Sequence, residues 1–535
     1  MRVVVFLMSL LLSLPLYADA QLTLKQKTDD IEQLVSLLRS SYGPRDYKEG
    51  LGISIEDLRK KYLSQLEGTH NGEFYYLILR MVAELRDSHF SAAIPTSHSA
   101  TLGFTTDLVE DRVLIEQINR NLLPEAVFDF QKGDEVISID GEPMASLLQR
   151  LSSYRGMGYA GTSRRLSAML VSSRPGRTVP VPTGEATVSI GRGTSDIIET
   201  VVLRWQEQGE SLDEMIPATS KAFSLGTQKT FNPSDFQLSI REALQEIMPN
   251  FERSYACSGR TRVAIPEGAT ILMTNPFVAY YHATPKGNVG YLRIPHYYPQ
   301  DAQGEPAFEE RFAQYEWAVE QLEAHTAGLI LDQDHNCGGS VDYLERMAGL
   351  FLREAFAPLQ FEFLASKPEY LKFQGWLNEL PRHTLERENF SETVDLLKKH
   401  WLLGDFLTPR ISFFGLAKRK PQPYGYTKPI VMLIDEMSGS GGDAFPALLQ
   451  GNGRAKLLGT RTMGAGGHVE EAPPLNNSGI SLWLTKSLFY RPNGIAIENN
   501  GAMPDIPYTM TRDDFLYKYR NYQKFYLEKL LEIIP

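Results

Sequence analysis

The sequence predicts an α/β protein of several domains. Residues 286–535 alternate strand-like apolar runs with helical patterns, as expected for a sheet covered by helices. Residues 21–95 carry apolar side chains at helical spacing, and residues 100–206 contain short β-rich runs separated by turn residues. A chain of 535 residues exceeds what one hydrophobic core usually organises, so we expect these parts to fold as separate units.

Residues 21–95 are predicted to form a helical N-terminal region. Apolar side chains recur at helical spacing, for example at Ile31, Leu34 and Leu38. The helical pattern ends before the sequence LRDSHF of residues 85–90, and Pro95 stops any further helix. His89 therefore follows the last helix expected in this region.

Residues 100–206 are predicted to form a compact β-rich module. Its sequence resembles that of a PDZ domain at residues 102–104, LGF, and at residues 132–141, KGDEVISIDG. The resemblance implies that Leu102, Gly103 and Phe104 form a loop that binds a peptide carboxylate, while the peptide adds as a strand to the neighbouring sheet edge.

The segment between the module and the α/β region has weak periodicity. Residues 207–285 contain many Ser, Thr and Pro, which favours a connecting or regulatory segment. Within residues 286–535, strands are expected near 289–294, 328–331, 430–434 and 457–459. Helices are expected near 308–322, 341–352, 444–449 and 513–533.

The first 20 residues have the pattern of a secretory signal. Met1 and Arg2 precede an apolar run over residues 3–16, and the small-residue sequence ADA ends at Ala20. The run is shorter than the roughly 20 apolar residues that span a bilayer. We therefore expect cleavage after Ala20 and export to the periplasm or the medium, with no membrane span left in the mature chain.

Composition excludes several classes of function. A formal net charge of −11 argues against binding to nucleic acid, which normally requires clustered Lys and Arg. The ten histidines show no metal-ligand spacing, so neither a metal nor another cofactor is predicted. The chain contains only two cysteines, Cys257 and Cys337. We expect both to be free thiols, although the sequence leaves their pairing open.

Three glycine-rich turns follow strands in the α/β region. They occupy residues 329–340, 430–445 and 458–468. Such turns can bring backbone N–H groups close to a ligand. The third turn lacks the Gly-Lys-Ser/Thr ending of a phosphate-binding loop, so nucleotide binding is set aside.

The second turn carries a candidate nucleophile. Ser440 stands between Gly439 and Gly441, just before a helix whose N-terminus would favour developing negative charge. A serine at this position is most often a simple helix cap, so the pattern leaves both interpretations open. Ser438 is a rival nucleophile or a hydrogen-bonding support.

These turns, in this order behind a PDZ-like module, resemble the C-terminal-processing (tail-specific) serine proteases, peptidase family S41. The resemblance covers most of the chain and implies a ClpP/crotonase-like β-α spiral with Ser440 as nucleophile. It also implies an oxyanion hole formed by the N–H groups of Gly338, Gly339 and Gly441. Most members place a lysine base where this chain has Ala465, so another residue must deprotonate the serine.

One subgroup of the family resembles this chain at residues 85–91, 459–467 and 497–499. By that resemblance His89 is the general base and Glu498 the carboxylate that orients it. His335 and His468 also lie beside glycine turns and compete for the role of base. Asp443, Glu470 and Asp505 compete for the role of acid.

The predicted function is an exported serine endopeptidase that cleaves polypeptide substrates through an acyl-enzyme. The resemblance further implies a proenzyme that cuts itself within residues 207–284, and a homodimer. The main alternative is a non-catalytic protein of the same fold that binds a hydrophobic ligand or a peptide. A third interpretation is an inactive regulator that acts through its PDZ-like module.

Overall fold

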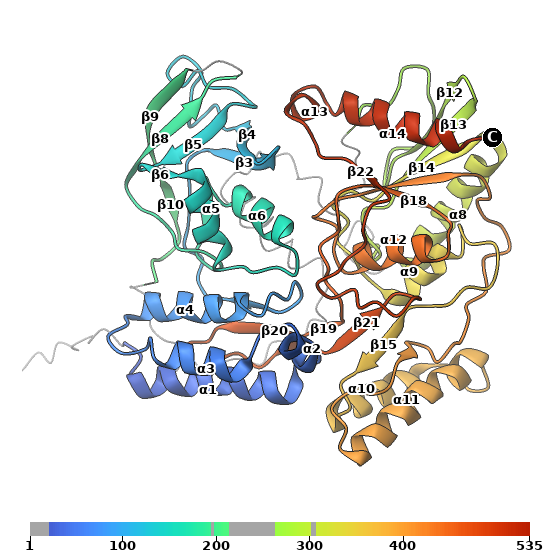
Figure 1. Cartoon of the computed structure of the whole chain (residues 1–535), viewed down its shortest axis with the longest axis horizontal. Helices are drawn as coiled ribbons and strands as arrows, with labels where there is room; N and C mark the ends of the chain where they lie inside the picture. The colour runs from blue at the N-terminus through green and yellow to red at the C-terminus, as the bar shows by residue number, and fades with distance from the viewer. Residues whose placement is uncertain (1–20, 194–196, 213–262, 301–306) are drawn as a thin grey trace, which may run out of the picture.

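The computed structural model describes residues 21–193, 197–212, 263–300 and 307–535. The N-terminal helices and the β-rich module form one side of the molecule, and the C-terminal α/β domain forms the other (Figure 1). The predicted signal at residues 1–20 and most of the predicted self-cleaved segment lie outside the described residues. No helix within the described ranges is long and apolar enough to cross a membrane.

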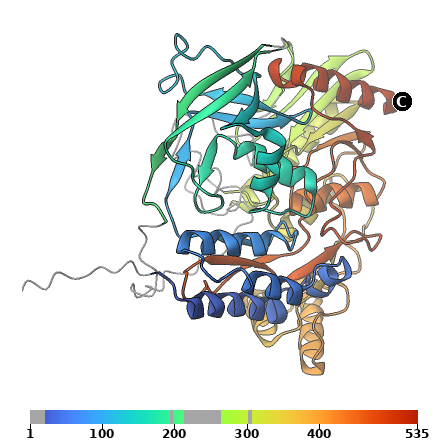
Figure 2. The ribbon, with the colours of Figure 1, turned by 60° about the vertical axis from the view of Figure 1, so that its left-hand side comes forward.

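The N-terminal region is helical, as predicted. Its helices are α1 (Leu24–Ser41), α2 (Arg45–Gly50), α3 (Ile55–Leu63) and α4 (Asn71–Ala83). Thr23 and Gln26 cap the start of α1 reciprocally. The apolar stripe of α1 is buried against α3, α4 and strand β20 (Ser481–Thr485), which runs between these helices in Figures 1 and 2. Strand β20, from the C-terminal part of the chain, thus contributes to the hydrophobic core of the N-terminal helices.

The β-rich module contains a sheet of order β3-β4-β5-β8-β9, with β6 pairing β5. The strands are β3 (Phe104–Val109), β4 (Arg112–Ile118), β5 (Glu135–Ile139), β6 (Glu142–Pro143), β8 (Glu185–Gly191) and β9 (Ile198–Arg204). Helices α5 (Met144–Ser152) and α6 (Ala160–Met169) cover the sheet. A second small sheet pairs β2 (Ser99–Thr101) with β7 (Ser173–Pro175) and β10 (Gln206–Gln208).

The C-terminal domain contains a seven-stranded sheet of order β11-β12-β13-β14-β17-β18-β22. Its strands are β11 (Thr270–Met273), β12 (Ala279–Thr284), β13 (Gly287–Arg293), β14 (Gly328–Asp332), β17 (Ile430–Ile434), β18 (Lys456–Gly459) and β22 (Ile506–Pro507). From β13 onwards neighbouring strands are parallel, so their carboxyl ends meet at one edge. The predicted connecting segment 207–285 therefore ends too late, because β11 and β12 already belong to this sheet.

Helices cover both faces of the sheet. On one face lie α8 (Phe308–His325), α9 (Val341–Ala348) and α12 (Gly441–Gly451), and on the other lies α14 (Arg520–Ile533). Because strand side chains alternate, Leu329 and Leu331 of β14 face the first core, while Ile330 faces α14. The helix expected at 513–533 is instead divided, since Lys518 and Tyr519 have positive φ between α13 (Arg512–Leu516) and α14.

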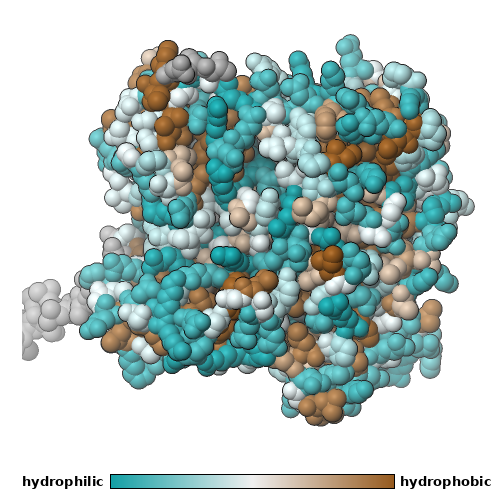
Figure 3. All heavy atoms as spheres, viewed as in Figure 1, coloured by the Kyte–Doolittle hydropathy of each residue, from teal (hydrophilic) through white to brown (hydrophobic). Residues whose placement is uncertain are grey.

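A helical hairpin projects from the C-terminal domain. It comprises α10 (Lys367–Glu379) and α11 (Leu385–Leu403) beside the sheet of β15 (Gln360–Phe363), β16 (Ile411–Ser412) and β21 (Ser487–Tyr490). Brown surface marks the lower end of this hairpin in a mainly hydrophilic face (Figure 3). The last sheet pairs β20 with β1 (Ser91–Ala93) and β19 (Val469–Ala472), which joins the segment after His89 to the C-terminal domain.

Candidate active site

Ser440 occupies a strained position at the carboxyl edge of the sheet. It links β17 to α12 with a φ of 59°, which is uncommon for a residue other than glycine. Its backbone N–H donates to Asp443 Oδ2 at 2.8 Å, while its hydroxyl makes no capping hydrogen bond. The side chain is therefore not engaged as the simple helix cap that its position suggested.

The hydroxyl of Ser438, the rival nucleophile, is hydrogen-bonded to neighbouring residues. Its buried hydroxyl donates to the carbonyl of Gln333 at 2.9 Å and lies 3.0 Å from Asp435 Oδ1. These contacts join the first glycine-rich turn to the second. Ser438 is thus a hydrogen-bonding support, which was the alternative role considered for it.

The first glycine-rich turn lies directly against Ser440. A Cβ added to Gly338 would stand 2.6 Å from Ser440 Cβ, so only glycine allows this approach. The N–H of Gly338 donates to Asn336 Oδ1 at 2.8 Å. Within the described ranges, the N–H groups of Gly339 and Gly441 donate to no protein acceptor. Of the three predicted oxyanion donors, the N–H of Gly338 therefore already has a protein acceptor in this structure.

Asp443 connects the second glycine-rich turn, which carries Ser440, to the third. Its fully buried carboxylate accepts hydrogen bonds from the N–H groups of Ser440, Gly464 and Ala465 at 2.7–2.9 Å. Burial raises the pKa of Asp443 to about 6, although these hydrogen bonds oppose the rise. Ala465, at the position where the resemblance implies a lysine in other proteins, is buried, and its N–H binds the same Asp443 oxygen as the N–H of Ser440.

His89 is a buried imidazole with no protein partner among the described residues at either ring nitrogen. Asp87 fixes its backbone, because Asp87 Oδ1 accepts the N–H groups of His89 and Phe90 at 2.8 and 3.0 Å. Burial lowers the pKa of His89 to about 4, which the charge of Asp87 opposes. The ring is thus neutral at pH 7 and able to accept a proton.

Glu498 lies deep in the same region, with no exposed surface. One carboxylate oxygen accepts the N–H of Gly466 at 2.9 Å, and the other pairs with the ammonium of Lys48. Burial and the nearby charge of Asp87 raise the pKa of Glu498 to about 7, while Lys48 lowers it. Glu498 makes no hydrogen bond to His89 in this structure, and His89 makes none to Ser440.

The comparisons with known proteins fit this geometry. Residues 288–508 match peptidase family S41, and residues 98–216 match a PDZ domain. The C-terminal domain belongs to peptidase family S41. The predicted fold class is thereby confirmed, as an S41 peptidase domain combined with a PDZ domain and a mixture of helices and sheets.

Several chlamydial proteins resemble the whole chain. It is 27% identical to a protein of Chlamydia muridarum over 97% of this chain and 94% of the relative. It is 28% identical to a protein of Chlamydia trachomatis serovar D over 96% of this chain and 93% of that relative. Among solved structures, mature CPAF complexed with lactacystin has a TM-score of 0.78 and 25% identity, covering 95% of this chain and 98% of that one. The subgroup that the motifs resemble is represented among these structures by CPAF, the chlamydial protease-like activity factor.

The competing histidines of the S41 domain are both engaged. His335 pairs with Asp435, whose Oδ2 lies 3.2 Å from the Nε2 of the ring. His468 Nδ1 lies 2.9 Å from the hydroxyl of Ser487, and its Nε2 lies 3.4 Å from Glu470. His89 is therefore the candidate whose ring is not already bound to a neighbouring side chain.

The competing acids also have structural roles. Asp505 accepts the N–H of Leu457 at 2.8 Å beside the sheet edge. Glu470 pairs with both His468 and Lys372, and these contacts lower its pKa despite burial. Asp87 was not considered from the sequence, yet its charge acts on both His89 and Glu498. Its position two residues before His89 was the one available signal.

One group of side chains in the described ranges has metal-like spacing. The ligand atoms of Glu369, His468 and Glu470 lie within 4.8 Å of one another. The ammonium of Lys372 binds both carboxylates, so a protein cation already occupies the position between them.

Cys337 is disulfide-bonded. The expectation of two free thiols is therefore wrong, because pairing depends on the tertiary distance between cysteines, which spacing along the chain does not reveal. Cys257 lies outside the described residues.

In the loop predicted to bind a carboxylate, two backbone N–H groups already donate to other groups of the PDZ domain. The N–H of Leu102 donates to the carbonyl of Ser172, and that of Gly103 donates to Thr101 Oγ1. The side chains of Leu102 and Phe104 are buried. Peptide binding at Leu102, Gly103 and Phe104 stays a prediction, and it requires these N–H groups to change partners.

Arg165 of α6 joins the PDZ domain to the turn that carries Ser440. Its buried guanidinium makes two hydrogen bonds to Asp107 at 2.8–2.9 Å and one to Glu436 at 2.9 Å. Thr162 of the same helix donates to the carbonyl of Glu436 at 2.6 Å. The backbone four residues before Ser440 is thus held by the PDZ domain.

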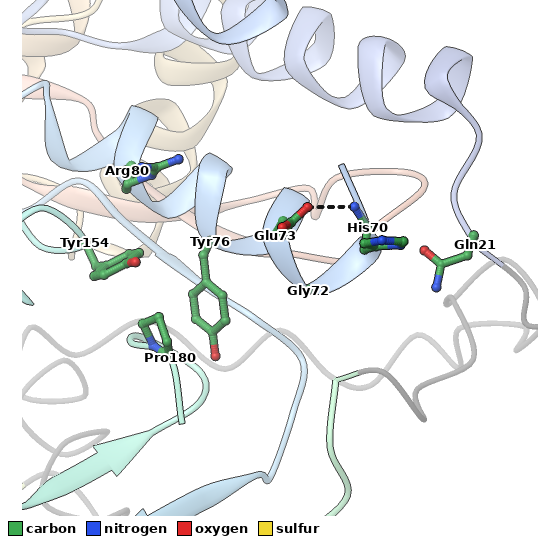
Figure 4. A pocket seen from close by; sticks show the side chains of 8 residues that line it. All are labelled: Gln21, His70, Gly72, Glu73, Tyr76, Arg80, Tyr154 and Pro180. Carbon is green, nitrogen blue, oxygen red and sulfur yellow. Dashed lines mark hydrogen bonds between the residues drawn. The ribbon is translucent and has the colours of Figure 1, made fainter. Parts of the chain in front are cut away.

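An open groove of about 710 Å³ lies between α4 and the PDZ domain, lined by Gln21, His70, Gly72, Glu73, Tyr76, Arg80, Tyr154 and Pro180 (Figure 4). None of these is a predicted catalytic residue. The groove is therefore separate from the site around Ser440.

Burial of His89 predicts a dependence of stability on pH. Below its unfolded-state pKa of 6.5, the unfolded chain takes up a proton that the folded protein resists until about pH 4. His89 should therefore cost the folded state about 3 kcal/mol as pH falls from 7 to 4. Urea unfolding of wild type and His89→Asn at several pH values isolates this effect from the carboxyl groups.

The expected result is that the stability of wild type relative to His89→Asn falls across this pH window. A difference that stays constant between pH 7 and pH 4 would show that the folded protein does not resist protonation of His89.

Proposed function

We propose that this chain is an exported serine endopeptidase in which Ser440 is the nucleophile, His89 the general base and Glu498 the orienting carboxylate. Its substrates are polypeptides, as family membership suggests. The observation that carries the proposal is the Ser440 turn, where a strained, glycine-flanked serine keeps its hydroxyl out of the helix cap and lies against Gly338.

The chemistry follows from the positions of these groups. A serine hydroxyl is a poor nucleophile at pH 7, so a base must take its proton as it attacks the peptide carbonyl. The neutral imidazole of His89 can take that proton and then give it to the leaving amine. Since His89 makes no hydrogen bond to Ser440 here, substrate binding must bring the two groups together; catalytic hydrogen bonds often tighten only then.

Charge developing on the carbonyl oxygen needs fixed donors. The N–H of Gly441 at the start of α12 and that of Gly339 are the groups available in this arrangement. Proton uptake by His89 creates an imidazolium in a buried site. The charge of Asp87 favours that imidazolium, and in this proposal Glu498 supplies the second negative charge.

Labelling with a fluorophosphonate probe tests the nucleophile. We expect the mature chain, full length or after self-processing, to be labelled, with mass spectrometry placing the adduct on Ser440. Ser440→Ala should lose both labelling and casein cleavage. Ser340→Ala, which removes the capping serine of α9, should keep both.

An adduct on another serine would refute the assignment of Ser440. The non-catalytic alternative has one observation in its favour, namely the missing hydrogen bonds between His89, Ser440 and Glu498. It requires that no processed form be labelled or cleave casein. Export by residues 1–20, self-cleavage within 207–284 and a homodimer complete the proposal.

A further inference from the structure

A lysine from the N-terminal helices lies inside the proposed active site. Lys48 of α2 is 1% exposed, and its ammonium contacts the Glu498 carboxylate, Asn499 Oδ1 at 2.6 Å and the carbonyl of Arg86 at 2.8 Å. An ammonium has three donors, and all three have acceptors here. Lys48 is therefore held in a single orientation.

The three acceptors belong to the two segments that carry the acid and the base. Glu498 and Asn499 are consecutive, and Arg86 lies three residues before His89 with a φ of 49°. Asn499 Nδ2 also donates to the carbonyl of Arg86 at 2.8 Å. Beside Lys48, the hydroxyl of Tyr47 donates to the backbone carbonyl of Glu498 at 2.8 Å. Helix α2 thus fastens the Glu498 loop to the His89 segment.

The charge of Lys48 is needed because two carboxylates share this buried region. Burial and Asp87 both disfavour an ionised Glu498, and Lys48 opposes them. A protonated Glu498 could not stabilise an imidazolium on His89. The titratable and charged groups that act on or respond to Glu498 are Lys48, Asp87, Tyr42, Tyr47 and Arg461.

We infer that Lys48 is a positioning residue that keeps Glu498 ionised and oriented during catalysis. The inference rests on the proposed function. In this S41 domain the turn at Gly464, Ala465 and Gly466 has no lysine. The ammonium instead arrives from α2 and contacts the carboxylate that binds the Gly466 N–H. Lys48 would thus supply positive charge to the acid, without itself taking the serine proton.

The first test compares the pH dependence of kcat/KM for Lys48→Met, Lys48→Arg and wild type. Lys27→Met is the matched control, because Lys27 is also buried in the N-terminal helices and bonds a backbone carbonyl remote from Glu498. We expect Lys48→Met to lower kcat about 10- to 100-fold with little change in KM, and to move the acid limb to higher pH. Lys48→Arg should recover part of the loss, and Lys27→Met should match wild type.

The second test places K48M in an E498Q background, where residue 498 is already neutral, so that the double variant removes both members of the Lys48–Glu498 ion pair and leaves neither unpaired. If Lys48 acts through Glu498, K48M should then change kcat by less than about twofold. A loss as large as in the wild-type background overturns the inference, as does an unshifted acid limb.

A measurement without turnover separates this inference from the proposed function. Carbon-13 NMR of Glu carboxylates, assigned by difference from E498Q, should show a higher titration midpoint for Glu498 in K48M than in wild type. Equal midpoints would overturn the role of Lys48. If wild type is neither labelled nor active while the midpoints differ, the proposed function fails but the effect of Lys48 on Glu498 stands.

Discussion

Replacing His89 by alanine is expected to lower kcat for peptide hydrolysis by about 10⁴- to 10⁶-fold without loss of fold. His89 is the buried imidazole whose ring has no bonded neighbour among the described residues, and its lowered pKa keeps it neutral at pH 7. Without His89, the proposed mechanism loses the base that takes the serine proton. Steady-state kinetics on a fluorogenic peptide, with circular dichroism to verify folding, measures the effect.

His468→Asn is the control for this prediction. His468 is also a histidine of the glycine-rich turns, but its ring is bound to Ser487 and Glu470. We expect its replacement to lower kcat far less than His89→Ala. If the order of the two effects were reversed, His468 would be the base and the assignment of His89 would be wrong.

The second large effect concerns stability. Arg165→Met should lower the free energy of unfolding by about 3–5 kcal/mol, because it leaves buried carboxylates without their cation. Arg165 is buried and pairs with Asp107 of the PDZ domain and with Glu436 of the nucleophile turn. Urea unfolding at pH 7 provides the measurement.

The adjacent arginine offers a matched control. Arg164 pairs with Asp111 at the surface, where ion pairs contribute at most about 1 kcal/mol. Arg164→Met should therefore have a small effect on unfolding. Equal effects of the two substitutions would mean that the link between the PDZ domain and the nucleophile turn does not stabilise the fold.

Local patterns were sufficient to predict the elements around Ser440. The apolar run of β17, the glycines after it and the helix that follows are encoded within residues 430–451, so periodicity and turn chemistry revealed them. The same is true of the N-terminal helices and of the short strands of the PDZ domain. Helix ends were less accurate, as at Tyr519, because tertiary contacts decide where a helix stops.

The role of individual side chains was harder to predict. Ser438 and Asp443 lie in the recognised turn, but only their contacts show that one supports the first turn and the other holds Gly464 and Ala465. Asp87 has no motif of its own. Its importance comes from burial next to His89 and Glu498, which raises the strength of charge interactions.

The sequence by itself determined the order of domains, the glycine-rich turns and the position of Ser440, because these depend on neighbouring residues. Tertiary structure alone decided that β20 completes the core of the N-terminal helices and that Arg165 reaches the nucleophile turn. It also decided that Lys48 meets Glu498 across 450 positions of sequence. Local sequence patterns do not predict such long-range contacts, because the residues next to each partner in the sequence are compatible with many other positions in space.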